Sequence, residues 1–220
     1  MIKQLAIRLS AMKHALSRWL SRAGGNPARK LSRETDKEGT NMNTVERYNN
    51  TAIALHWLIA LLIFAAFPLG LYMHDLPLSP TKLQLFSYHK WIGITVLFLA
   101  FVRVVWRITH TPPALPDSIP RLLQMASHIV HGFLYALLFA VPISGWLMSS
   151  AKGFKTVWFG VVPLPDLVDK DKALGDLLTG VHESLNYILL LLVVLHIAAV
   201  IKHSFIDKDD VLTRMLPKGK

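Results

Sequence analysis

The stretch His182-Glu-Ser-Leu-Asn-Tyr-Ile-Leu-Leu-Leu-Leu-Val-Val-Leu-His196 joins two histidines through a largely apolar segment. Fourteen residues are close to four helical turns, so both imidazoles project from nearly the same face, about 21 Å apart along the axis. A bilayer core is about 30 Å thick, so a spanning helix would carry one histidine near each edge. Ionisable side chains in membrane helices are costly and usually functional, and neutral imidazole is a common axial ligand of haem iron. The spacing predicts two stacked haems, one near each membrane surface.

The composition is typical of a membrane protein. Hydrophobic residues make up 52% of the 220 positions and charged residues 17%, whereas a soluble domain carries about 25% charge. The absence of Cys excludes thiolate-ligated haem, covalent haem attachment and cysteine-ligated iron–sulfur clusters. The formal net charge of +10 does not indicate nucleic acid, because the basic residues gather at segment ends and in the N-terminal extension.

Four hydrophobic segments follow one another, each long enough to cross a bilayer as a helix. They run from about Thr51 to Tyr72, Tyr88 to Ile108, Ala126 to Ser149 and Leu178 to His203. Pro68 and Pro142 stand late in the first and third segments, where we expect local bends. The sequence therefore predicts an all-α membrane protein, a four-transmembrane-helix bundle enclosing two b-type haems.

The distribution of Lys and Arg predicts the orientation, since cytoplasmic loops carry an excess of both. Of the 24 such residues, 18 lie in the two terminal regions or the link between the second and third segments. The remaining six lie in or beside the other two loops. We therefore expect both termini in the cytoplasm, and the loops at 76–87 and 151–177 outside.

Residues 1–41 form a basic N-terminal extension ahead of the four-helix domain, which we place at residues 42–220. Leu5, Leu9, Leu16 and Leu20 recur at helical spacing among basic residues. One interpretation is an amphipathic helix lying on anionic lipid. The other is a dispensable or disordered tail, with Met42 as an alternative start.

The predicted topology assigns each histidine a depth in the membrane. His56 and His196 lie at the same depth in the cytoplasmic half, while His89 and His182 lie at the start of their helices, at the outer edge of the membrane. This pairs His56 with His196 on the inner haem and His89 with His182 on the outer one. His131, at the cytoplasmic edge of the third segment, competes for the inner site.

Arginine and glycine residues at the same levels fit bulky anionic cofactors. Arg103 lies 14 residues beyond His89 and reaches the inner level, where haem propionates need cations; ordinary positive-inside anchoring is the alternative. Gly70 and Gly145 fall at the outer level, where glycine would let a macrocycle approach the backbone. Small-residue helix packing explains them equally well.

Taken together, several motifs resemble the bacterial cytochrome b561 family of small di-haem membrane proteins, over about four-fifths of the chain. They are Ala54-Leu55-His56-Trp57-Leu58, Tyr88-His89-Lys90, Arg103-Val104-Val105-Trp106-Arg107, His128-Ile129-Val130-His131, Pro142-Ile143-Ser144-Gly145, His182-Glu183-Ser184-Leu185, Leu195-His196-Ile197-Ala198-Ala199 and Arg214-Met215-Leu216-Pro217. The resemblance implies two non-covalent haem b groups, electron transfer across the inner membrane, ubiquinone as a partner and superoxide as a candidate donor. The family also grades into the cytochrome b subunits of hydrogenases and formate dehydrogenases.

Three functions are compatible with these features. The first is a stand-alone oxidoreductase of the inner membrane that moves electrons between an outer reductant and ubiquinone. The second is a cytochrome b membrane anchor for a larger dehydrogenase or hydrogenase complex, and the third is a transporter or structural protein. The expected partners are membrane lipid, ubiquinone, a small donor outside the membrane and a second copy in a homodimer.

Reduction of quinone needs hydrogen-bond donors and a protonatable group near a haem edge. Lys90 adjoins His89 and Glu183 adjoins His182, the two predicted ligands of the outer haem. An ammonium group can donate a proton and a carboxylate can accept one, so we predict the quinone or proton site there. His131 is the alternative on the cytoplasmic side.

Overall fold

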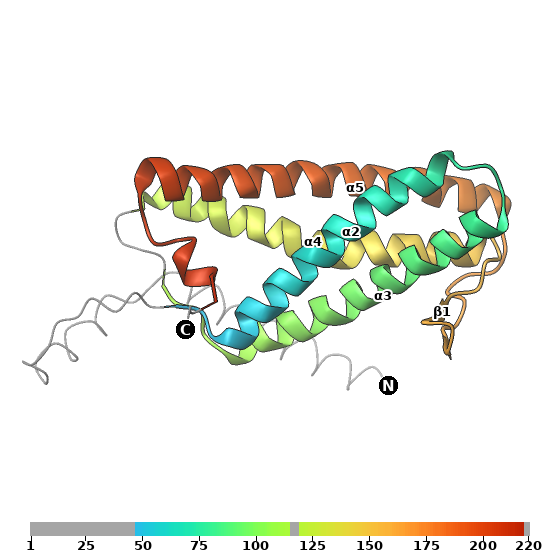
Figure 1. Ribbon diagram of the computed structural model, residues 1–220, viewed down its shortest axis with the longest axis horizontal. Coiled ribbons are helices and arrows are strands. Elements are labelled where there is room, and N and C mark those ends of the chain that lie inside the picture. The colour runs from blue at the N-terminus through green and yellow to red at the C-terminus, as the bar shows by residue number, and fades with distance from the viewer. Residues whose placement is uncertain (1–46, 115–118, 218–220) are drawn as a thin grey trace, which may run out of the picture. The chain divides into compact units, whose positions relative to one another are not determined.

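The computed structural model describes residues 47–114 and 119–217. Their long helices are α2 (Asn50–Asp75), α3 (Pro80–Thr109), α4 (Arg121–Ala151) and α5 (Lys172–Ile201) (Figure 1). All four are long and apolar enough to span a bilayer, which confirms the predicted four-helix membrane protein. The predicted extension at residues 1–41 lies outside the described residues.

The helices begin further upstream than the hydrophobic segments alone predict. The largest difference is at α3, which starts at Pro80 rather than near Tyr88. Ser79 caps this helix by accepting a hydrogen bond from the Lys82 amide at 3.2 Å, and proline suits the first helical turn. Asp171 caps α5 in the same way through the Leu174 amide. Pro68 and Pro142 both lie inside continuous helices.

The four helices pack as two pairs. α4 packs along α5, and α2 packs along α3. The two pairs are connected by contacts between α3 and α4. Figure 1 shows α4 and α5 side by side. Among the described residues, α5 makes few close backbone approaches to α2 or α3. Side chains therefore bridge the space between α5 and these two helices, which is the region where flat cofactors were predicted.

The C-terminal segment closes one end of the bundle, which we call the base and define by Tyr48 and Arg214. After α5 the chain forms the π-helix η2 (Lys202–Asp207) and the short 3₁₀-helix η3 (Thr213–Met215). The Tyr48 amide donates to the Arg214 carbonyl at 3.2 Å, and Trp57 Nε1 donates to the Met215 carbonyl at 2.8 Å. The beginning of α2 and the end of the described chain therefore lie together.

The opposite end carries a small β-hairpin, so we call it the hairpin end. Strands β1 (Val157–Trp158) and β2 (Val162–Pro163) pair antiparallel between α4 and α5. The sequence predicted only a loop in this region, because two-residue strands are too short to give an alternating pattern. His74 follows the predicted end of the first hydrophobic segment at Tyr72, but it lies in the last turn of α2, because the helix continues beyond that segment.

Candidate functional site

The first candidate site lies toward the hairpin end, where α5 faces α3. The ring centroids of His89 and His182 are 6.3 Å apart, with the ring planes at 87°. His182 Nδ1 lies 3.1 Å from the Val141 carbonyl and 3.0 Å from Ser144 Oγ. An Nδ1–H that donates to a carbonyl leaves Nε2 of the neutral ring free to bind a metal, an orientation typical of ligating histidines.

The second candidate site lies toward the base, where α5 faces α2 and α4. The His56 and His196 centroids are 6.3 Å apart, with the ring planes at 74°. His131 lies closer to His196, at 5.3 Å, and its Nδ1 is 2.7 Å from the Ser127 carbonyl. The structure therefore brings together both pairs predicted by depth and also keeps His131 beside the second pair.

Both pairs have the spacing that a shared metal ion requires. A metal–nitrogen bond to histidine is about 2 Å long, so two imidazoles on opposite sides of one ion have centroids roughly 6 Å apart. The His89–His182 and His56–His196 spacings both match this value, whereas that of His131 and His196 is about 1 Å shorter. Four imidazoles in two pairs at this spacing are a donor set that suits two six-coordinate b-type haems.

Glycines lie directly against the first pair. A Cβ built on Gly145 would lie 3.0 Å from His182 Cε1, and one on Gly70 would lie 3.2 Å from His89 Cε1. Both glycines occupy the level predicted from their spacing, and a larger side chain would displace the rings. Gly93 differs, since its Cβ would meet nothing within 4 Å.

A cavity of about 340 Å³ opens at the base beside the second pair. Its described lining contains Arg47, Arg103 and Arg107 and no acidic side chain. Arg103 Nε donates to Tyr135 Oη at 3.0 Å, and its Nη1 lies 3.4 Å from the Ala52 carbonyl, one turn before His56. This concentration of guanidinium groups suits carboxylates such as haem propionates.

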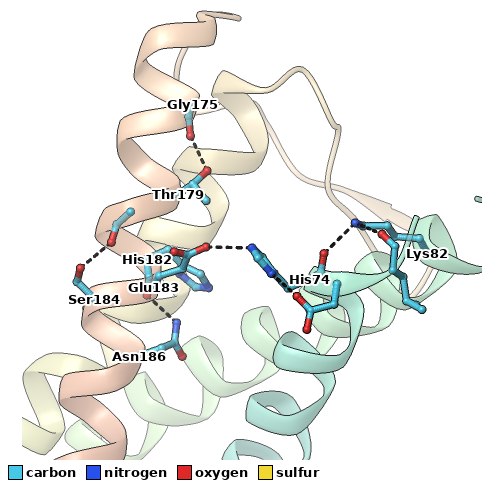
Figure 2. A network of polar contacts seen from close by, with 11 residues as sticks. His74, Lys82, Gly175, Thr179, His182, Glu183, Ser184 and Asn186 are labelled. Atoms are coloured by element: carbon cyan, nitrogen blue, oxygen red, sulfur yellow. Dashed lines mark hydrogen bonds and ion pairs between the residues drawn. The ribbon is translucent and has the colours of Figure 1, made fainter. Parts of the chain in front are cut away.

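Lys90 and Glu183 are both close to the first pair but have different neighbours. Lys90 Nζ donates to Ser149 Oγ at 3.3 Å and to the Lys155 carbonyl at 2.9 Å. Glu183 Oε1 lies 3.6 Å from His74 Nε2, and Figure 2 shows the His74 ring directed at Glu183 beside His182. The two predicted residues therefore contact different helices, α4 and α2, rather than each other.

Three neighbours of the site residues were absent from the sequence-based prediction. Ser144 contacts His182, Tyr135 contacts Arg103, and His74 contacts Glu183. Ser144 stands beside Gly145 in a motif that already carried the resemblance, and Tyr135 stands one turn beyond His131. Such spacing places these residues on a face but does not identify which neighbouring helix they meet.

Comparison with known proteins supports the same interpretation of the chain. A family model described as prokaryotic cytochrome b561 matches residues 47–218. Cytochrome b561 homolog 2 of Escherichia coli (strain K12) is 37% identical over 187 residues, which cover 80% of this chain and 95% of the relative. Probable superoxide oxidase CybB of Yersinia pestis is 29% identical over 186 residues, which cover 80% of this chain and 98% of the relative. The family model covers all four long helices and both histidine pairs.

Proposed function

The chain belongs to the prokaryotic cytochrome b561 family of membrane electron-transfer cytochromes, and from that premise we propose a di-haem protein that carries electrons from an outer reductant to ubiquinone. The observation that carries this proposal is the pair of imidazoles 6.3 Å apart at each of two levels, with one member of each pair on α5. A single helix thereby positions a metal-binding group toward each end of the bundle. The family implies b-type haem, and its multi-pass architecture points to the bacterial inner membrane.

In this proposal the histidines hold two haems and the base arginines hold propionates. His89 with His182 would bind the haem nearer the hairpin end, and His56 with His196 the one nearer the base. Haem b supplies one-electron redox chemistry when bound. Arg103, fixed by Tyr135 and the Ala52 carbonyl, would pair with a propionate of the haem at the base.

The base would face the cytoplasm and the hairpin end the outside, because this orientation puts most Lys and Arg residues on the cytoplasmic side. Superoxide is the favoured donor because one relative is named a probable superoxide oxidase. Two superoxide anions give up one electron each and become two molecules of oxygen. Ubiquinone takes those two electrons and two protons to become ubiquinol, so the reaction balances.

The test of this proposal is the activity of the purified chain on its own. Superoxide generated in solution should reduce a water-soluble ubiquinone analogue with two haems bound per chain, and the rate should fall as ionic strength rises. The physical reason is that Lys90, Lys152 and Lys155 surround the hairpin end and attract a small anion through fields that salt screens. Activity only with a tightly co-purifying soluble subunit would instead indicate a membrane anchor.

We propose that quinone is reduced beside the first pair, where Lys90 and Glu183 adjoin His89 and His182. Lys90→Gln and Glu183→Gln should each lower quinone reductase activity by roughly a hundredfold or more, since a positioned proton-transfer group typically contributes about 10²–10⁴-fold to the rate. His131→Gln, at the other end, should leave this activity largely unchanged. The haem content of each variant is measured first, and steady-state quinone reduction second.

The opposite pattern would move the quinone site. If His131→Gln alone abolished quinone reduction while both haems remained, the site would lie at the base. Lys172→Gln is the control for surface charge at the hairpin end, since its side chain is 93% exposed and pairs only with Asp176 among the described residues.

A further inference from the structure

The connection between α4 and α5 contains ten consecutive uncharged residues, from Thr156 to Pro165. They include the β1–β2 hairpin and expose apolar side chains at its turn: Phe159 is 55% exposed and Val161 78%. Val157 and Val162 in the strands are exposed as well. A cluster of this kind is unfavourable in water and marks contact with lipid or another protein.

Two tryptophans attach this hairpin to the side of α3. Trp91 Nε1 donates to the Val157 carbonyl at 2.7 Å, and Trp158 Nε1 donates to Thr95 Oγ1 at 3.1 Å. Thr95 lies six residues beyond His89, or about 9 Å further along the helix toward the base. The hairpin therefore runs back beside the membrane-spanning part of α3, as Figure 1 shows for β1.

The part of α3 that the hairpin covers belongs to an uncharged stretch at 91–102, between Lys90 and Arg103. Trp91, Thr95 and Phe98 follow one another at helical spacing and so lie on one face of α3. Phe98 is 56% exposed. The apolar surface of the hairpin is thus continuous with an exposed apolar surface of a spanning helix.

Hydrogen bonds within the hairpin pair three of its backbone amides. The Gly160 amide donates to the Val157 carbonyl, the Val161 amide to the Trp158 carbonyl, and the Leu164 amide to the Thr156 carbonyl, at 2.9–3.2 Å. Pro163 has no N–H group to satisfy. Irregular backbone that is only partly paired is excluded from the hydrocarbon core, which favours an interfacial depth for this turn.

The turn also holds an aromatic residue in a conformation that suits glycine. Phe159 has φ 51°, and Gly160 follows with φ 73°. A bulky residue with positive φ is uncommon, so the surroundings must hold it there. Phe159 packs against Trp91 and Trp158, with ring centroids 5.5 and 5.2 Å apart, in an aromatic cluster of the kind that marks membrane interfaces.

We infer that the β1–β2 hairpin is a membrane anchor whose turn, from Phe159 to Val162, inserts at the boundary between lipid headgroups and acyl chains in the leaflet at the hairpin end. Lipid is favoured because the exposed surface continues onto the spanning part of α3 and has no charge to match a polar partner. The chain just before the anchor is tied to α3 beside His89, since the Lys155 carbonyl accepts a hydrogen bond from Lys90.

The test uses the natural absence of cysteine from the chain. Val161→Cys in the full-length protein is labelled with an environment-sensitive fluorophore and placed in lipid nanodiscs. We expect blue-shifted emission, strong loss of fluorescence with doxyl-labelled phospholipid, and little loss with aqueous iodide. Phe98→Cys serves as the lipid-facing reference, and Asp169→Cys, exposed in the same connection, as the water-facing reference.

Either of two results would overturn the anchor. Quenching of the Val161 label by iodide, as for Asp169, would place the turn in water. Quenching by neither agent would place it under protein, such as a second copy of this chain. The haem absorption spectrum checks that each variant is folded, and Val162→Cys replaces Val161→Cys if that variant does not fold.

Discussion

Replacing His182 by alanine should remove the haem toward the hairpin end, and replacing His196 should remove the haem toward the base. Each substitution deletes one of the two imidazoles that would complete a low-spin, six-coordinate iron. We therefore expect haem content to fall from two to one per chain in each variant, as measured by pyridine haemochrome assay. Two six-coordinate haems surviving in either variant would defeat the assignment.

The partner histidines make this result specific to each site, even though α5 carries a ligand for both. His89→Ala should give the same remaining spectrum as His182→Ala, and His56→Ala the same as His196→Ala. His131→Ala decides between the two candidates at the base. It should retain both haems, because the 6.3 Å separation of His56 and His196 matches a shared ion better than the 5.3 Å separation of His131 and His196.

Replacing Gly145 by leucine should selectively weaken binding of the haem toward the hairpin end. A Cβ at this position would already lie 3.0 Å from His182 Cε1, so a branched side chain must push the imidazole away. Overpacking of this kind costs about 1–3 kcal/mol, which corresponds to a loss of haem affinity of roughly fivefold to 150-fold. Haem titration of the apoprotein, followed by absorption spectroscopy, measures the effect.

Gly132→Leu is the matched control on the same helix. A Cβ at Gly132 would meet nothing within 4 Å, and alanine or leucine favours a helix more than glycine does. This variant should bind two haems as the unmodified protein does. Equal haem affinity in the Gly145 and Gly132 variants would show that the close approach to His182 does not matter for binding.

The sequence by itself determined the four spans, because a membrane helix must pair its own backbone groups and bury an apolar length that matches the bilayer. It also determined the level of each histidine. His182 and His196 share one helix, so their separation follows from the helical rise alone, and the predicted contacts of His182 with His89 and of His196 with His56 are present.

Only the tertiary structure decided which side chains meet across helices. His56 and His131 are both close to His196, and Lys90 and Glu183 contact α4 and α2 rather than one another. These outcomes depend on how each helix is rotated and how far it stands from its neighbours. The position of the hairpin depended on tertiary contacts in the same way, because Trp91 and Thr95 of α3 hold its two-residue strands in place. A segment this short has no sequence periodicity from which that contact could be predicted.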